Sequence, residues 1–266
     1  MINKRIKKLR SKFDEFGIDG YVIPKNDEFF SEFSQKDRLK VISNFTGSAG
    51  YAIILKKKNY LFVDGRYTIQ AGIEAGKEFQ IIDYKKIINC KVFKNLTLGI
   101  DPRIFTSDQI KKFFLKNNKI KIIQPNLLDL IFNKYKSYSK PFFSIDKNIV
   151  GENHLIKLKR IVKLLKKIKS NYLFISAPEN VAWILNIRGG DGPNTPMPNS
   201  RLIISKNKKI FLISKIKKCK KLFENKKINL KKFIDIKKIS KKISELKGKN
   251  FIIDSSSCSI FFENII

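Results

Sequence analysis

The stretch that decides the fold runs from Asn44 to Tyr67 and contains NFTGSAGYAIIL (44–55) and YLFVDGRY (60–67). Two apolar runs rich in β-branched and aromatic residues flank the gap KKKN, which predicts a β-hairpin over 52–55 and 60–63. A Gly-Ser-Ala-Gly loop leads into the first run, and Asp-Gly-Arg-Tyr leads out of the second. These two loops are therefore the first candidates for a functional site, as a phosphate cradle, a catalytic elbow or the rim of a site.

Outward from this hairpin, the same order of expected elements occurs twice. Each half has a long helix, a strand, a glycine-containing loop and a hairpin, over 2–16, 20–23 and 52–63 and then over 152–169, 172–176 and 201–213. The segment 136–150 (KSYSKPFFSIDKNIV) breaks the pattern and is interpreted as a linker. This order indicates an internal duplication of an α/β domain. We predict two domains, 1–137 and 142–266, each with a mixed sheet flanked by helices.

The end of the second half is unusual for a complete domain. After the expected strand NFIID, the chain runs SSSCSIFFENII and stops on apolar residues. We expect Phe261, Phe262 and Ile265 to be exposed and to favour aggregation. The second domain is therefore predicted to be incomplete at its C-terminus, either in a fragment or in a natural truncation.

Composition limits the classes of protein that fit. The formal net charge of the 266 residues is +33, but the lysines are spread over every expected helix and gap, and arginine is scarce. This spread favours drift under AT-rich coding over a dedicated nucleic-acid site, with weak polyanion binding at low salt. No apolar run reaches the roughly 18 residues that cross a bilayer. Three scattered cysteines fit a reducing compartment, so we predict a cytoplasmic protein without a membrane or specific nucleic-acid partner.

The usual catalytic and metal motifs do not fit the sequence. The Gly47–Gly50 loop precedes a strand, whereas a phosphate cradle follows a strand and opens a helix. Ser48 lacks the G-x-S-x-G context, and the single histidine, His154, is expected on the surface of a helix. One histidine and three dispersed cysteines do not form a zinc set, and the carboxylates show no cluster. We expect no catalytic residue and no tightly bound metal on this chain.

Two charged pairs remain as candidates. Asp64 follows an expected strand and could point into a cleft, or it could cap the next helix and pair with Arg66 at the surface. Arg188 and Asp191 flank two glycines and are expected to pair locally. The segment 193–198 is expected to be stiff and to form an interface rim.

Four segments together resemble a known family: VIPKNDEFFSEF (22–33), NFTGSAGYAIIL (44–55), LFVDGRYTIQA (61–71) and AWILNIRGGD (182–191). They look like the N-terminal part of the three-domain Xaa-Pro aminopeptidases of the creatinase/aminopeptidase P family. That resemblance implies two creatinase N-terminal-like domains ahead of a catalytic domain. There, two divalent metal ions, usually manganese, are held by Asp, Asp, His, Glu and Glu, and a metal-activated hydroxide attacks the bond before proline. None of these five ligands can be matched here, so the resemblance implies a non-catalytic N-terminal region.

The resemblance also implies roles for particular residues. Ser48, Ala49 and Gly50 would approach a partner subunit, and Asp64 and Arg66 would order that loop. Tyr67 would belong to the substrate rim or the oligomer interface, and Arg188 and Asp191 would line the face of the second domain. A homo-oligomer, specifically a dimer, and X-Pro peptide substrates are the implied partners. Two other functions stay open at this point: a stand-alone pseudoenzyme or interaction module, and a charge-driven polyanion-binding protein.

Overall fold

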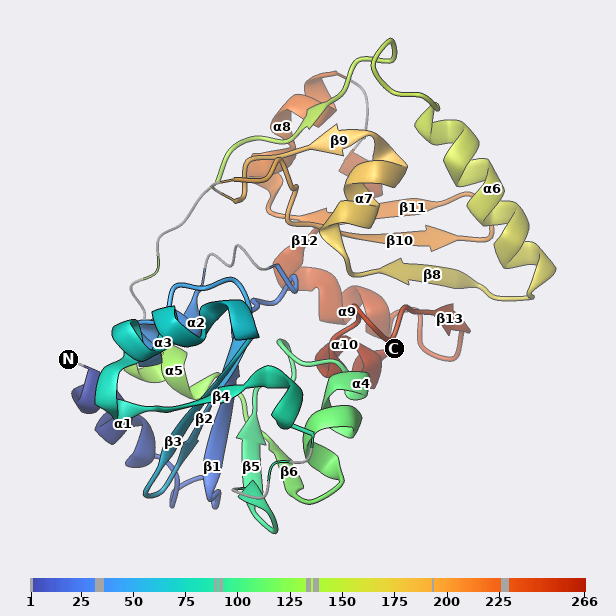
Figure 1. The fold of residues 1–266 in the computed structure, drawn as a ribbon. Coiled ribbons are helices and arrows are strands. Elements are labelled where there is room, and N and C mark those ends of the chain that lie inside the picture. Colours follow the sequence, from blue (N-terminus) through green and yellow to red (C-terminus); the bar gives the residue numbers. More distant parts are fainter. Residues whose placement is uncertain are drawn as a thin grey trace. The chain divides into compact units, whose positions relative to one another are not determined.

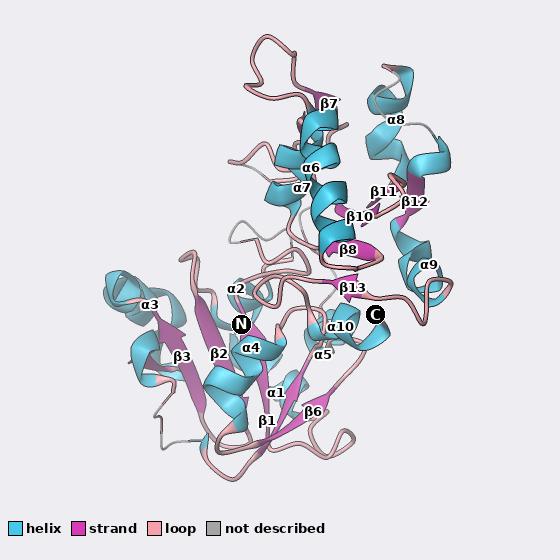
Figure 2. Cartoon of the chain, turned by 90° about the vertical axis from the view of Figure 1, so that its right-hand side faces the viewer, coloured by secondary structure: helices cyan, strands magenta, loops and turns pink. Residues whose placement is uncertain are grey.

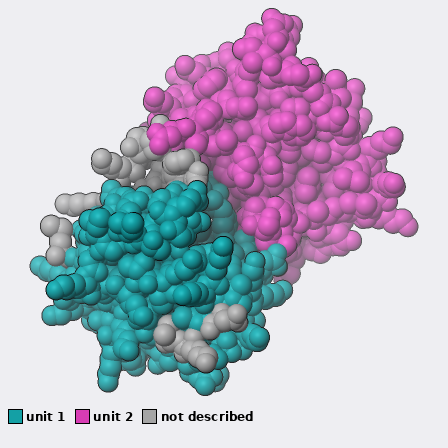
Figure 3. Space-filling view, viewed as in Figure 1, with its two compact units in different colours: residues 1–136 teal, residues 137–266 magenta. Residues whose placement is uncertain are grey.

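The computed structural model describes residues 2–31, 36–88, 90, 93–132, 135, 139–192, 194–225 and 230–266 (Figure 1). The chain forms two compact units, residues 1–136 and 137–266, which Figure 3 colours separately. Each unit combines one main β-sheet with helices, which confirms the predicted α/β class.

Unit 1 is built on a six-stranded mixed sheet. Its strands are β1 (Gly20–Pro24), β2 (Gly50–Leu55), β3 (Asn59–Val63), β4 (Gln80–Asp83), β5 (Thr97–Ile100) and β6 (Lys119–Ile122). Its helices are α1 (Ile2–Arg10), α2 (Arg38–Ser43), α3 (Thr68–Ala75), α4 (Ser107–Ile110) and α5 (Leu127–Ile131). The strand order is β4-β3-β2-β1-β5-β6, and β2 is antiparallel to both of its neighbours. The predicted hairpin thus lies inside the sheet, and its strand β2 is one of the two central strands.

Unit 2 carries a five-stranded sheet in the order β12-β11-β10-β8-β13. Its strands are β7 (Phe143–Ser144), β8 (Tyr172–Ile175), β9 (Ile187–Arg188), β10 (Arg201–Ser205), β11 (Ile210–Ser214), β12 (Phe233–Asp235) and β13 (Phe251–Ile252). Its helices are α6 (His154–Lys167), α7 (Pro178–Leu185), α8 (Ile216–Glu224), α9 (Ile239–Ser244) and α10 (Ile260–Ile265). β7 and β9 form a separate antiparallel pair.

The two sheets share one topology. In each, an antiparallel hairpin pairs with an earlier strand, and parallel strands extend both sides, as β4 and β5 do in unit 1 and β12 and β13 do in unit 2. The element order that indicated a duplication in the sequence is therefore matched by the pairing of the strands.

The apolar tail differs from its prediction. Phe262 is only 6% exposed and lies 5.2 Å, ring to ring, from Phe174 of β8. Phe261 and Ile265 pack partly buried against the same cluster, because the tail forms α10 and covers one side of the unit 2 sheet. The expectation that these side chains are exposed was wrong.

Two local expectations also differ from the structure. The expected linker 136–150 contains β7, which pairs with β9. The helix expected over 2–16 ends at Arg10 and continues as turns. Thr106 caps α4 through a reciprocal capping box with Gln109. Within the described ranges, no helix is both long and apolar enough to cross a bilayer.

Candidate functional site

Three loops meet at one end of the unit 1 sheet because β2 runs antiparallel to both β1 and β3. Pro24 at the end of β1 lies opposite Tyr51, and Gly50 at the start of β2 lies opposite Val63 at the end of β3. The segments that follow β1, precede β2 and follow β3 are therefore neighbours. They carry three of the four sequence motifs, although these lie up to forty residues apart in the chain.

A cavity of about 370 Å³ lies where these loops meet. Its lining combines one lysine, one carboxylate, one amide, three aromatic rings and the backbone of the glycine loop, from Lys25, Asn26, Phe30, Ser48, Ala49, Gly50, Tyr51, Asp64 and Tyr84. The structure thus brings together four of the residues predicted from sequence, Ser48, Ala49, Gly50 and Asp64. Sequence reasoning missed Lys25, Asn26 and the three aromatic residues, although Lys25 and Asn26 lie within the motif that follows β1.

The glycine loop 47–50 is tightly packed. A Cβ atom at Gly47 would overlap the Phe45 ring, and one at Gly50 would lie 2.8 Å from the carbonyl oxygen of Phe62 in β3. Both positions require glycine because of close approach. The hydroxyl oxygens of Ser48 and Tyr67 lie 3.0 Å apart, which joins this loop to the Asp-Gly-Arg-Tyr loop.

Helix α3 holds the same loop from its other side. Glu74 accepts hydrogen bonds from the Thr46 backbone nitrogen at 2.7 Å and from its hydroxyl at 2.6 Å. Gln70 donates to the Thr46 hydroxyl at 2.8 Å. Partial burial raises the pKa of the Glu74 carboxyl, but the bonds from Thr46 and Gln70 outweigh it, so that this pKa is lowered overall. The loop is therefore held in one conformation before any ligand arrives.

Asp64 and Arg66 pair with each other, as expected if Asp64 caps the next helix and meets Arg66 at the surface. The Asp64 carboxylate accepts from the Arg66 backbone nitrogen at 3.0 Å and from its Nε at 2.9 Å. These hydrogen bonds lower the pKa of Asp64, so it is ionised at neutral pH. Asp64 nevertheless lines the cavity, whereas the Arg66 side chain is 75% exposed. The carboxylate therefore caps a turn and at the same time places a negative charge at the cavity mouth.

The aromatic wall is formed by Tyr51 and its neighbours. The Tyr51 ring stacks on Tyr84 at 5.7 Å and on Phe105 at 6.3 Å. Burial, followed by the effect of the neighbouring Tyr84, raises the pKa of Tyr51 above its ordinary value. The Tyr51 hydroxyl is therefore neutral throughout the physiological range and acts only as a donor or acceptor of hydrogen bonds.

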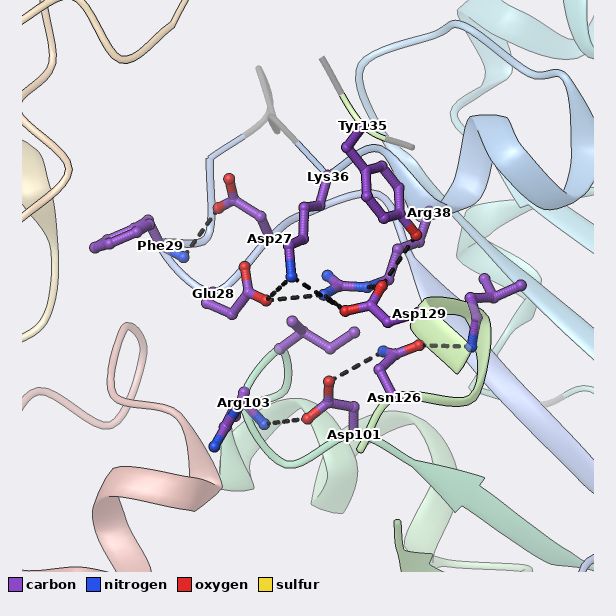
Figure 4. Close-up of polar contacts among 12 residues, drawn as sticks. Asp27, Glu28, Phe29, Lys36, Arg38, Asp101, Arg103, Asn126, Asp129 and Tyr135 are labelled. Carbon is purple, nitrogen blue, oxygen red and sulfur yellow. Dashed lines mark hydrogen bonds and ion pairs between the residues drawn. The ribbon is translucent and has the colours of Figure 1, made fainter. Parts of the chain in front are cut away.

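An ionic cluster around the buried Arg38 side chain supports the segment that follows β1 (Figure 4). Arg38 is 1% exposed and donates two hydrogen bonds of 2.9 Å to Asp129 and one of 2.8 Å to Glu28. Lys36 also contacts Asp129, at 3.1 Å, and Tyr135 donates to it at 3.0 Å. Burial opposes ionisation of both carboxyls, but Arg38 and Lys36 hold the pKa values of Glu28 and Asp129 below their ordinary range.

The ionic cluster was not found from sequence. Arg38 and Asp129 lie 91 positions apart, so no local pattern links them. The adjacent Lys25 is anchored separately, by a 2.6 Å contact to Asp37. Of the residues that line the cavity after β1, Lys25 is therefore held by an ion pair, and Asn26 by a 2.9 Å hydrogen bond to the carbonyl oxygen of Ile104.

In unit 2, the predicted pair of Arg188 and Asp191 is replaced by other contacts. Asp191 is 1% exposed, lies 2.5 Å from Lys218 of α8, and accepts from the Asn199 backbone nitrogen at 2.7 Å. Arg188 donates to the carbonyl oxygen of Ile187 at 2.9 Å. Desolvation raises the pKa of Asp191 despite these partners. The prediction that Arg188 and Asp191 pair locally was wrong, because the loop folds Asp191 inward onto Lys218 of α8.

The glycines between these residues line a second cavity of about 550 Å³. Its wall includes Gly189, Gly190, Lys140, Phe143 and Pro196. A Cβ atom at Gly189 would lie 2.8 Å from Pro198, so the loop needs glycine here. Asp191 does not line the cavity. It anchors the loop that does, through its contacts with Lys218 and the Asn199 backbone. Pro193, part of the expected rim, lies outside the described residues.

The described residues contain no group of three or more His, Cys, Asp and Glu that could hold a metal ion. His154 opens α6 in unit 2, and the hydroxyl of Ser48 contacts Tyr67 in unit 1. The site is therefore described by its cavity, its fixed loops and its charges.

Comparison with known proteins gives consistent matches. The Creatinase/Prolidase N-terminal domain family matches residues 5–124, and a second Creatinase/Prolidase N-terminal domain family matches residues 133–266. A probable Xaa-Pro aminopeptidase P of Laccaria bicolor is 27% identical over 227 residues, which cover 79% of this chain and 35% of the relative. Xaa-Pro aminopeptidase 1 of Dictyostelium discoideum is 29% identical over 239 residues, or 81% of this chain and 38% of the relative. The chain thus spans little more than a third of these relatives.

Among solved structures, the X-prolyl aminopeptidase from Caenorhabditis elegans has the same fold. It aligns with a TM-score of 0.82 and 21% identity over 95% of this chain and 46% of its own. The strand topology, the two family matches and this structural likeness agree over both units. The chain therefore belongs to the creatinase/prolidase N-terminal domain family.

Proposed function

We propose that this chain is the non-catalytic N-terminal region of a metal-dependent Xaa-Pro aminopeptidase, which releases an N-terminal residue that precedes proline. The observation that carries the proposal is the convergence of three motifs on one cavity in a chain whose relatives are named Xaa-Pro aminopeptidases. In this role the chain supplies oligomer contacts and the rim of a cleft.

The chemistry of the unit 1 cavity supports a peptide-facing rim. Asp64 provides a negative charge, Lys25 and Asn26 provide donors, and Tyr51 and Tyr84 provide aromatic surface. A short peptide that contains proline offers a cation, backbone carbonyls and an apolar ring, which match these groups in kind. Ser48, Ala49 and Gly50 form the part of the rim that we assign to contact with substrate or with a partner subunit, and Arg66 and Tyr67 hold it.

The metal ions belong elsewhere in this proposal. The Caenorhabditis elegans enzyme is described as cytosolic, with a di-nuclear active site. The described residues of this chain offer no set of ligands for such a centre. In this proposal two divalent ions, manganese in the implied enzyme, are held by the catalytic region of the full-length protein. We propose a cytoplasmic, dimeric enzyme in which Arg188 and Asp191 shape the wall of the second cavity.

A chimera tests this function. The chain replaces the matching N-terminal region of the Dictyostelium discoideum relative, and hydrolysis of X-Pro peptides is measured with manganese present. We expect the chimera to cleave these peptides and the 266-residue chain alone to be inactive. A chimera no more active than the catalytic region without any N-terminal region would contradict the proposal.

Arg66→Ala in this chimera tests the rim. We expect kcat/KM to fall about tenfold because the Arg66 contacts hold Asp64 at the cavity. Arg160→Ala is the matched control, since Arg160 also makes an exposed ion pair, with Glu152, away from the cavity lining. Equal kinetics for the two variants would remove Arg66 from the site.

A further inference from the structure

Helix α6 is amphipathic, and every charged residue on it is basic. It reads HLIKLKRIVKLLKK, and Val162 and Leu165 pack into the core of unit 2 on one side. Ile156, Arg160 and Leu164 follow at intervals of four residues, so they form one row along the exposed side of the helix. Ile156 is 50% exposed and Leu164 is 55% exposed. The helix therefore presents apolar side chains to solvent among its cations.

The cations on this side are largely uncompensated. Lys163 and Lys167 are exposed, and each follows a member of the row by three residues. Within the described ranges neither lysine forms an ion pair, whereas Arg160 pairs with Glu152 at 2.6 Å. This side of α6 is therefore strongly basic and attracts anions.

Trp183 extends the basic side from the neighbouring helix. α6 and α7 pack side by side (Figure 2), and the Nζ atom of Lys157 lies 4.0 Å from the centre of the Trp183 ring. The same Nζ donates a 2.7 Å hydrogen bond to the Trp183 carbonyl oxygen. Lys157 is 4% exposed, whereas Trp183 is 55% exposed, so a buried lysine holds the ring beside α6 with much of it in water. Glu179, one turn earlier on α7, adds an exposed carboxylate nearby.

Other helices have one part of this combination. α1 (INKRIKKLR) also lacks acidic residues, but its large apolar side chains are all buried. α3 exposes Ile69 and Ile73, yet it contains neither lysine nor arginine. α8 combines lysines with a single exposed large apolar side chain, Ile216, and ends at Glu224. α6 and Trp183 combine unpaired cations with several exposed apolar side chains.

This combination decides which partner fits. A nucleic acid would contact the lysines and would leave Ile156 and Leu164 in water. The surface of an anionic bilayer offers phosphate and carboxylate groups above an apolar phase, so it matches both kinds of side chain. A tryptophan ring suits the boundary between these two layers, because it is apolar and carries one hydrogen-bond donor.

We propose that the α6 surface, defined by Ile156, Lys163, Leu164, Lys167 and Trp183, binds the surface of anionic lipid bilayers. The lysines contact headgroups, while the three apolar side chains enter the boundary with the acyl chains. A helix that lies on a membrane needs no bilayer-spanning segment, so the length limit from which the sequence predicts no membrane partner does not apply to it. The contact goes beyond the proposed function and does not rest on it.

The fluorescence of Trp183 tests the proposal, because Trp183 is the single tryptophan of the chain. The 266-residue chain is titrated with vesicles of phosphatidylcholine and phosphatidylserine in equal amounts. We expect a saturable shift of the emission to shorter wavelength, since the ring leaves water for the bilayer boundary. Vesicles of phosphatidylcholine alone should give no shift. Heparin should bind at low salt through the lysines without a shift, because it offers no apolar phase.

Ile156→Ser combined with Leu164→Ser tests the apolar part of the surface. We expect the dissociation constant for the mixed vesicles to rise at least about tenfold, because two aliphatic side chains no longer enter the bilayer. Ile69→Ser combined with Ile73→Ser is the matched control, since it makes the same change on the exposed face of α3 and should leave the affinity unchanged. All four side chains are exposed, and thermal melts check that both double variants stay folded.

Lys163→Glu combined with Lys167→Glu tests the charged part. We expect this variant also to bind the mixed vesicles at least about tenfold more weakly than the wild type. Lys4→Glu combined with Lys8→Glu on α1 is the matched control, because these lysines are exposed, lie four residues apart and give the same change in net charge. The control should lose clearly less affinity, since the proposal depends on where the cations lie.

Several results would overturn the proposal. These are an emission that does not shift with the mixed vesicles, a shift of equal size with phosphatidylcholine vesicles or with heparin, and a control variant that loses as much affinity as its α6 counterpart. Vesicle binding without a shift would indicate adhesion by charge alone and would also overturn it. None of these measurements depends on the activity of the peptidase chimera.

Discussion

At the scale of single residues, Arg38 carries the charge on which the ionic cluster depends. Its side chain is 1% exposed and neutralises Glu28 and Asp129, which come from two segments far apart in the chain. Removing one partner of a buried ion pair costs more than the pair contributes, because it leaves a charge without compensation. The segment after β1 therefore depends on Arg38 for its position, and the Lys25 side of the cavity depends on that segment.

Arg38→Ala should lower the free energy of unfolding by up to about 3 kcal/mol, since Lys36 still contacts Glu28 and Asp129 in the variant. Urea denaturation at neutral pH measures this loss. Arg66→Ala is the control, since Arg66 is 75% exposed and surface pairs contribute about 1 kcal/mol or less. Equal losses in the two variants would show that the ionic cluster is not buried as described.

The pairing of Arg38 with Glu28 and Asp129 predicts that the free energy of unfolding depends on pH. The pKa values of Glu28 and Asp129 are lowered in the folded state, so their pairing stabilises the fold above the ordinary carboxyl pKa of about 4. That contribution is lost as pH falls through the lowered folded values. The gap in unfolding free energy between wild type and Arg38→Ala should therefore shrink from neutral to acid pH. A constant gap would contradict the assigned pKa directions.

Lys218 and Asp191 allow a similar experiment in unit 2. Lys218→Met should destabilise this unit by about 3–5 kcal/mol because it removes the cation that contacts the buried Asp191 carboxylate. Adding Asp191→Asn removes that charge and should restore part of the stability. Thermal melts of the two single variants and the double variant measure the coupling. Additive losses would mean that the two side chains act independently.

At the scale of elements, the glycine loop and α3 respond oppositely to the same substitution. Gly50→Ala places a Cβ atom 2.8 Å from the Phe62 carbonyl of a neighbouring strand, which should cost about 1–3 kcal/mol. Gly72→Ala fills open space in a helix and should stabilise unit 1 by up to about 1 kcal/mol. Chemical denaturation of both variants checks the two signs, and a stabilising Gly50→Ala would contradict the close approach.

The elements also show what the sequence could predict. The hairpin of β2 and β3, the strand β1 and the helix α6 follow from local periodicity, and all four are present. Ser48, Gly50 and Asp64 could be chosen from their motifs. The Arg38 cluster could not, because its partners are distant in the chain, and neither could the contact of Asp191 with Lys218. Burial of the apolar tail likewise depends on α10 reaching β8 rather than on any local pattern.

At the scale of the whole molecule, the charge of +33 predicts salt-dependent adhesion. Lysines spread over the surface should give non-specific binding to heparin or DNA at low ionic strength, with no preference for sequence. Affinity should fall steeply as salt is raised from about 50 to 200 mM. Binding measured by fluorescence anisotropy at several salt concentrations tests this. Tight binding that resists salt would instead favour a dedicated polyanion site.

The lack of basic residues in α3 has a practical consequence. Trypsin cleaves after lysine and arginine. From Tyr67 to Lys77 the chain reads YTIQAGIEAGK, with no internal cleavage site between Arg66 and Lys77. A single tryptic peptide therefore carries Tyr67, the exposed side chains of Ile69 and Ile73, and Glu74. Mass spectrometry of that one fragment, after covalent labelling of the intact protein, reports on the helix face and on its link to the cavity together.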